Sequence, residues 1–179
     1  MLGRDPDEFG ATWRSGRAAR ETGSLADYLA TLGLSAEQVE SVAGLRREAT
    51  RSLMASPRPG AVETLRELRR RGLRVGLITV CSDDLPAVWP QTAFAGLFDA
   101  KVFSCDVRLR KPDPAIYLVA CDRLGVPPEN CMFVGDGAND ELAGAKRVGM
   151  RAVQIHRLGE EADWNGARIT SVAQVLDLV

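Results

Sequence analysis

From about residue 57 onward, short apolar runs alternate with segments whose apolar positions recur every three or four residues. The runs predict strands and the recurring positions predict helices. The expected strands are residues 73–79, 101–104, 131–135 and 151–156. The expected helices are residues 61–71, 84–98, 114–124, 140–148 and 171–178. Strands that alternate with helices predict an α/β fold, a doubly wound, parallel, Rossmann-like sheet with helices on both faces.

The first 56 residues contain no strand-like run and predict helices only. Ser24 begins a short helix over residues 24–32, and Ser35 begins a longer one over residues 35–54, where Gln38 completes a capping box. An apolar stripe is expected along the longer helix at Leu34, Val39, Val42, Leu45, Leu53 and Met54. Prolines and a glycine at residues 57–60 then divide the chain into a helical part, residues 1–57, and an α/β part, residues 58–179.

Composition narrows the class of protein without defining its activity. The 179 residues are 45% hydrophobic and carry a net charge of −1, so no basic field attracts nucleic acid. No run approaches the roughly 20 apolar residues of a membrane span, and no membrane association is expected. The four cysteines form no CxxC pair, which favours free thiols in a reducing cytoplasm.

Candidate chemistry lies where the expected strands end. Thr79 ends one strand, Lys111 stands in a loop before a helix, and Asp136 and Asp140 follow the strand over residues 131–135. In a doubly wound sheet these three loops can open on the same crevice. A hydroxyl, an ammonium group and two carboxylates that hold Mg²⁺ are the groups that phosphoryl transfer needs.

Three motifs resemble those of the haloacid dehalogenase-like hydrolase superfamily, whose members are mostly phosphatases. They are Leu77-Ile78-Thr79, Lys111-Pro112-Asp113-Pro114 and Gly135-Asp136-Gly137-Ala138-Asn139-Asp140. The likeness covers about residues 58–157, in order, and the preceding helices resemble the small cap of that family, which is inserted after the first strand.

The resemblance implies a role for each of these residues. Asp136 would bind Mg²⁺, and Asp140 would bind it through water or orient the lysine, with Glu141 as an alternative second acidic group. Lys111 would hold the nucleophile and the phosphate, and Thr79 would bind a phosphoryl oxygen. The acidic pair favours a small phosphorylated metabolite over a haloacid, because the dehalogenase branch usually lacks it. Without that context, Asp136 and Asp140 also fit a turn residue and a helix cap.

The family's first motif, a strand that ends in Asp-x-Asp and supplies the nucleophile, has no counterpart here. The only such spacing, Asp5-Pro6-Asp7, follows a short polar stretch and instead predicts a helix start, with Asp5 as the cap. In the family this strand lies between those expected at residues 73–79 and 131–135. Its absence predicts either a gap of about 10 Å between them or a sheet that closes up.

Three explanations for the absent strand remain open. The sequence is an N-terminally truncated form of an enzyme, a degenerate relative without catalysis, or a chain whose partner supplies the strand. The expected function is therefore Mg²⁺-dependent hydrolysis of a small phosphate ester, with little activity in these 179 residues alone. The alternative is a non-catalytic domain that binds a metal, a phosphate ligand or a protein, and an exposed gap makes self-association an expectation.

Two further groups of charged residues have open interpretations. Asp83 and Asp84 are expected to cap a helix. Arg14, Arg17 and Arg20 share one face of a single expected helix, either as a solvated face or as a contact for an anionic substrate.

Overall fold

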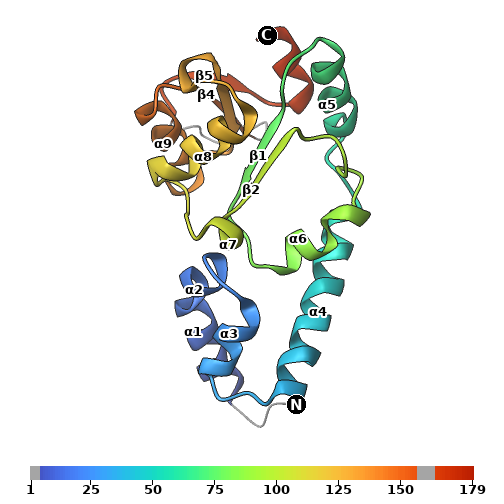
Figure 1. Cartoon of the computed structure of the whole chain (residues 1–179), viewed down its shortest axis with the longest axis vertical. Coiled ribbons are helices and arrows are strands. Elements are labelled where there is room, and N and C mark those ends of the chain that lie inside the picture. Colours follow the sequence, from blue (N-terminus) through green and yellow to red (C-terminus); the bar gives the residue numbers. More distant parts are fainter. Residues whose placement is uncertain (1–4, 157–163) are drawn as a thin grey trace.

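The computed structural model describes residues 5–156 and 164–179, which form a helical part and an α/β part (Figure 1). The helical part contains α1 (Pro6–Ser15), α2 (Arg17–Glu21), α3 (Leu25–Thr31) and α4 (Ala36–Met54). The α/β part begins with α5 (Ala61–Arg70), β1 (Gly76–Thr79), α6 (Asp84–Val88), η1 (Trp89–Gln91), β2 (Ala100–Phe103) and α7 (Ser104–Val107). It continues with α8 (Pro114–Leu124), η2 (Pro128–Asn130), β3 (Met132–Gly135), η3 (Ala138–Asp140), α9 (Glu141–Arg147), β4 (Arg151–Ile155), β5 (Ala167–Ile169) and η4 (Val172–Asp177).

Side-chain caps start the N-terminal helices where the sequence places them. Asp5 accepts hydrogen bonds from the backbone N–H groups of Asp7 and Glu8, so its helix-start interpretation is confirmed. Ser24 caps α3, and Ser35 with Gln38 forms the expected capping box of α4. Each cap satisfies donors at the helix end that have no partner within the helix.

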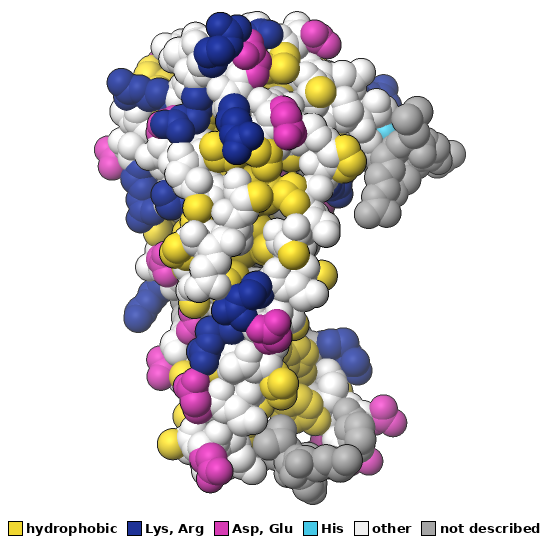
Figure 2. Space-filling model, turned by 90° about the vertical axis from the view of Figure 1, so that its right-hand side faces the viewer, with side chains coloured by type: hydrophobic (Ala, Val, Ile, Leu, Met, Phe, Trp, Pro, Cys, Tyr) yellow, Lys and Arg dark blue, Asp and Glu magenta, His cyan; other side chains and the backbone are white. Residues whose placement is uncertain are grey.

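The apolar stripe expected along α4 is only partly covered, because Val39, Val42 and Met54 are half-buried and no residue of this helix is fully buried. Leu45 is 72% exposed and Leu53 is 80% exposed. The helix packs against α3 near its start and against α6 near its end, so it runs between the two parts of the molecule with much of its surface uncovered. Figure 2 shows apolar side chains gathered along the middle of one face of the molecule.

The parallel strands form two separate sheets in the described part of the chain. β1 pairs with β2 in one sheet, and β3, β4 and β5 form the other in that order. All pairs are parallel, which confirms the expected α/β architecture. β1 and β3 are not hydrogen-bonded to each other, so the sheet has not closed up between them, and the predicted width of the gap stays a prediction.

Helix α8 joins the two sheets on one face. Its buried residues Ile116 and Tyr117 pack in one cluster with Val102 of β2, Phe133 of β3 and Ala152 of β4. On the other side of the second sheet, residues of α5 and η4 pack on β3, β4 and β5. Helices therefore cover both faces, as the strand and helix alternation predicts.

Several boundaries differ from the sequence-based prediction. β1 begins at Gly76 rather than at residue 73, and α6 ends at Val88, close to the two prolines that interrupt the expected helix. β5 and α7 are additional elements, and the last helix is a 3₁₀ helix. The division at residues 57 and 58 stays a prediction. No helix in the described ranges has both the length and the apolar character that crossing a membrane requires.

The joining role of α8 predicts a large stability cost at Ile116. Ile116 is fully buried, whereas Leu118 on the same helix is 47% exposed. We expect Ile116→Ala to lower the free energy of unfolding by about 2–5 kcal/mol, because it leaves a cavity between the sheets. Leu118→Ala is the matched control and should cost at most about 1 kcal/mol. Urea unfolding of both variants measures the difference, and equal costs would contradict the packing of α8 described above.

Candidate active site

A buried ion pair between Lys111 and Glu141 forms the centre of the site. The Lys111 Nζ donates to Glu141 Oε2, and the two side chains are 17% and 5% exposed. Lys111 lies in the loop between α7 and α8, and Glu141 is the first residue of α9. The ammonium also lies 5.6 Å from the centre of the Phe133 ring, an attractive cation–π distance.

The end of β3 is shaped to receive the Glu141 side chain. The Gly137 backbone N–H donates to Glu141 Oε1 at 3.1 Å, and the Tyr117 hydroxyl donates to the Glu141 backbone carbonyl at 2.8 Å. A Cβ at Gly135 would lie 2.1 Å from Glu141 Oε1, so a side chain at this position would displace the carboxylate. Gly135 is therefore required by this close approach.

Asp136 follows directly and is exposed at the carboxyl end of β3. The Ala138 backbone N–H donates to Asp136 Oδ1 at 3.0 Å, so the residue does form the turn that its sequence context also allows. This hydrogen bond is the main reason that the pKa of Asp136 lies below its usual value, and the positive charge of Lys111 acts in the same direction. The carboxylate is thus held in its charged form.

Asp140 occupies a different position from its neighbour Glu141. Its side chain is exposed, its φ is +57°, and it precedes α9 without a side-chain capping hydrogen bond. Glu141, which the sequence left as an alternative second acidic group, is the carboxylate that orients Lys111. The role of Asp140 as a metal ligand stays a prediction.

Thr79 is the last residue of β1 and lies in the other sheet. Among the described residues, no hydrogen bond joins it to Lys111, Asp136 or Glu141. The loop after it is fixed by Ser104, whose hydroxyl accepts from the Cys81 N–H at 2.9 Å.

The acidic groups at the site fit a magnesium ion that has few protein ligands. Mg²⁺ prefers oxygen ligands and is commonly held by one or two carboxylates, with water and substrate phosphate completing the shell. Asp136 offers an exposed, charged carboxylate, and Asp140 follows four residues later. In residues 5–156 and 164–179, no cluster of three or more His, Cys, Asp or Glu side chains is placed to form a closed cage.

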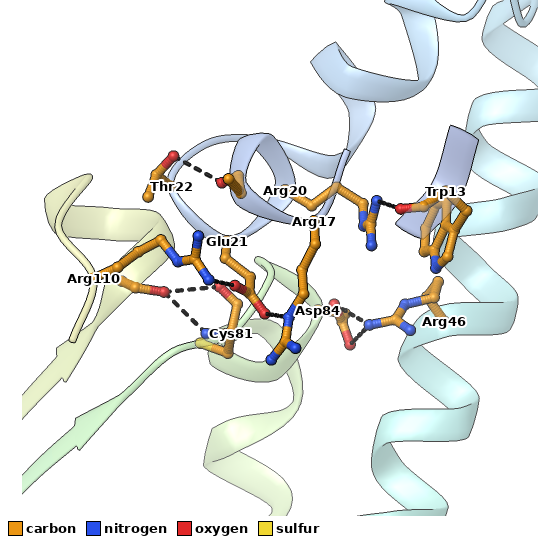
Figure 3. Close-up of polar contacts among 11 residues, drawn as sticks. Trp13, Arg17, Arg20, Glu21, Thr22, Arg46, Cys81, Asp84 and Arg110 are labelled. Atoms are coloured by element: carbon orange, nitrogen blue, oxygen red, sulfur yellow. Dashed lines mark hydrogen bonds and ion pairs between the residues drawn. The ribbon is translucent and has the colours of Figure 1, made fainter. Parts of the chain in front are cut away.

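Polar contacts that the sequence did not indicate join the helical part to the α/β part (Figure 3). Glu21 forms an ion pair with Arg110 at 2.8 Å. Arg110 directly precedes Lys111 in the sequence. Asp84 accepts hydrogen bonds from Arg46 and Thr50 of α4. Asp83 accepts from the backbone N–H of Leu25. Asp83 does occupy the N-cap position of α6, but it makes no side-chain capping bond there, because the oxygens of Asp83 and Asp84 bond to α3 and α4 instead.

The single helix expected to carry Arg14, Arg17 and Arg20 is also absent. α1 ends at Ser15 and α2 begins at Arg17, so Arg14 lies on the first helix and the other two lie on the second. Arg20 is buried, whereas Arg14 and Arg17 are exposed. The burial of Arg20 depends on contacts between different helices. The spacing of residues along a single segment gives no information about such contacts.

Comparisons with known proteins agree with this arrangement. The family model described as haloacid dehalogenase-like hydrolase matches residues 3–149. The chain is 34% identical over 145 residues to (S)-2-haloacid dehalogenase 4A of Burkholderia cepacia, covering 80% of this chain and 62% of that protein. It is also 34% identical over 111 residues to the glyceraldehyde 3-phosphate phosphatase of Methanopyrus kandleri, covering 60% of this chain and 47% of the relative.

A crystal structure of a HAD phosphatase from Thermococcus onnurineus superimposes with a TM-score of 0.73 and 26% identity, covering 99% of this chain and 82% of that one. The chain spans less than two thirds of the length of the two relatives named above. From its motifs, its fold and these matches, the chain belongs to the haloacid dehalogenase-like hydrolase family.

Proposed function

We propose that this chain carries the phosphate-binding part of a Mg²⁺-dependent phosphatase of small phosphate esters, with little turnover in these 179 residues alone. The observation that carries the proposal is the buried ion pair of Lys111 and Glu141 beside the charged Asp136 carboxylate. A fixed cation and a metal-binding carboxylate at one strand end are the groups needed to bind a phosphoryl group and to offset its charge. The phosphatase of Methanopyrus kandleri supports phosphate as the substrate group.

In this proposal Lys111 binds a phosphoryl oxygen, and Glu141 keeps the ammonium in place. The ion pair uses one of the three donors of the ammonium group, so others remain for the substrate. The low exposure of Lys111 strengthens its attraction for an anion, because little water screens it. Thr79 donates its hydroxyl to a second oxygen. Asp136 and Asp140 would hold Mg²⁺, which supplies positive charge to the phosphoryl group when bound.

The nucleophile is the part of the reaction that these residues do not provide. Family phosphatases use a strand that ends in Asp-x-Asp, and the only such spacing in the 179 residues lies at the start of α1. Asp5 is occupied there as a helix cap. Loss of a covalent nucleophile typically lowers turnover by about 10⁶. Substrate binding and turnover are therefore separate properties of this chain.

A specific observation favours a second candidate, a domain that binds a ligand or a protein partner without turnover. The Asp-x-Asp sequence caps a helix and does not end a strand. Both candidates predict slow hydrolysis. Only the phosphatase site predicts phosphate binding that depends on Mg²⁺ and on Lys111.

Lys111→Ala should weaken the binding of ethyl phosphate at least about tenfold in the presence of Mg²⁺, because a charge-assisted hydrogen bond is lost. Isothermal titration calorimetry measures the affinity, with and without Mg²⁺. Lys146→Ala, at an exposed position in the last turn of α9, makes the same change of net charge and should have little effect. An equal loss of ethyl phosphate affinity in the two variants would show that only the net charge of the protein matters, and it would contradict the proposed site.

The chain itself should hydrolyse p-nitrophenyl phosphate at a rate close to that of the buffer, since its only Asp-x-Asp spacing caps a helix and supplies no nucleophile at a strand end. Release of p-nitrophenol measures the rate. A robust rate that Asp136→Ala abolishes would show that other residues supply the nucleophile.

A further inference from the structure

Gln154 is a buried polar residue on β4, the central strand of the second sheet. It lies between the fully buried Val153 and the half-buried Ile155, and it is itself only 9% exposed. In the register of the two strands it is the partner of Gly135, the last residue of β3. It therefore lies beside the strand end that leads into the acidic loop, residues 136–140. A polar amide at such a position costs free energy unless hydrogen bonds satisfy it.

The amide of Gln154 donates to the backbone of the acidic loop. Its Nε2 lies 3.2 Å from the backbone carbonyl oxygen of Asp136. A Cβ at Gly137 would lie 3.0 Å from the same nitrogen, so the amide packs closely against the loop backbone. Because a carbonyl can only accept, this bond fixes which end of the amide faces the loop. Among the described residues, no donor contacts the other end, Oε1, although it is buried.

The backbone of the acidic loop needs such support. Gly137, Asn139 and Asp140 have φ angles of +92°, +53° and +57°. The left-handed conformation is unfavourable for residues that carry a side chain, and it persists where surrounding contacts hold it in place. The position of the loop, and of the carboxylates on it, therefore depends on the side chains that bond to its backbone.

Two carboxylates also bond to this backbone. Asp136 Oδ1 accepts from the Ala138 N–H, and Glu141 Oε1 accepts from the Gly137 N–H. Both carboxylates belong to the proposed site, one as a metal ligand and the other in the ion pair with the lysine. Gln154 carries no charge and reaches the loop from β4, which is hydrogen-bonded to a strand on each side. It therefore ties the loop to a rigid element that lies outside the site.

We propose that Gln154 is a positioning residue of the metal site, whose amide holds the Asp136 backbone so that the carboxylate is presented to Mg²⁺. Gln154 does not bind the ion itself. This inference rests on the proposed function. Mg²⁺ demands nearly ideal octahedral geometry, so a displaced carboxylate binds it less well. Groups that orient the ligands of a metal typically account for about 10–100-fold in metal affinity.

The test measures the binding of Mn²⁺, which takes the same oxygen ligands as Mg²⁺. Electron paramagnetic resonance counts free Mn²⁺ in titrations of the full chain, and competition with Mg²⁺ shows that the two ions share one site. Gln154→Met keeps the length of the side chain but removes the donor, so Mn²⁺ should bind at least about tenfold more weakly. Asp136→Asn removes the charged ligand and should abolish the binding.

Gln174→Met is the matched control. Gln174 also holds a loop, because its Oε1 accepts from the backbone N–H groups of Thr170 and Ser171 after β5. This variant should leave the affinity for Mn²⁺ unchanged. Urea unfolding without metal separates stability from affinity, because a purely structural glutamine would affect stability alone. Gln154→Asn keeps an amide on a stem too short for the Asp136 carbonyl and should also weaken binding, which guards against a folding defect in Gln154→Met.

Each result has a distinct meaning. If the Gln154 variants lose stability but keep the affinity for Mn²⁺, while Asp136→Asn abolishes binding, the metal site stands and the positioning role is overturned. An equal loss of affinity in Gln174→Met also overturns the positioning role. If Asp136→Asn keeps the affinity, or if the unmodified chain binds no Mn²⁺, the metal site of the proposed function fails and this inference fails with it.

Discussion

Burial of the Lys111 and Glu141 charges is the constraint around which the end of β3 is arranged. Removing two charges from water is costly, and their attraction offsets that cost only if further hydrogen bonds satisfy them. The Gly137 N–H supplies one such bond to the Glu141 carboxylate. The absence of a side chain at Gly135 gives that carboxylate its space. The glycines of the motif thus serve the glutamate, and through it they fix the position of the lysine.

The same ion pair links elements that are far apart in the sequence. Lys111 lies before α8, which packs on both sheets, and Glu141 begins α9, which packs on β3 and β4. Arg110, the neighbour of Lys111, carries the linkage to Glu21 in the helical part. A short loop therefore connects Lys111 with the helical part.

The sequence predicts best those features that depend on local chemistry. The bounds of α8 follow from Asp113, Pro114 and Gly125, and all three act as expected. The sequence could not decide whether Asp140 or Glu141 orients Lys111, because the directions of two adjacent side chains depend on backbone angles that the sequence does not reveal. The left-handed φ of Asp140 turns this residue into the exposed turn before α9. Burial of Arg20 was equally inaccessible, because it depends on the packing of α2 against distant segments.

The division of the strands into two sheets also determines how rigid the site is. Within a continuous sheet, backbone hydrogen bonds fix the spacing of neighbouring strands. Between Thr79 on β1 and the Lys111–Glu141 ion pair at the end of β3, the described structure has no such row of backbone hydrogen bonds. Their separation is set by side-chain packing beneath α8, which is softer than a row of backbone bonds. The two halves of the proposed phosphate site are therefore held less rigidly than neighbouring strands of one sheet, and a ligand that contacts both of them would stiffen their connection.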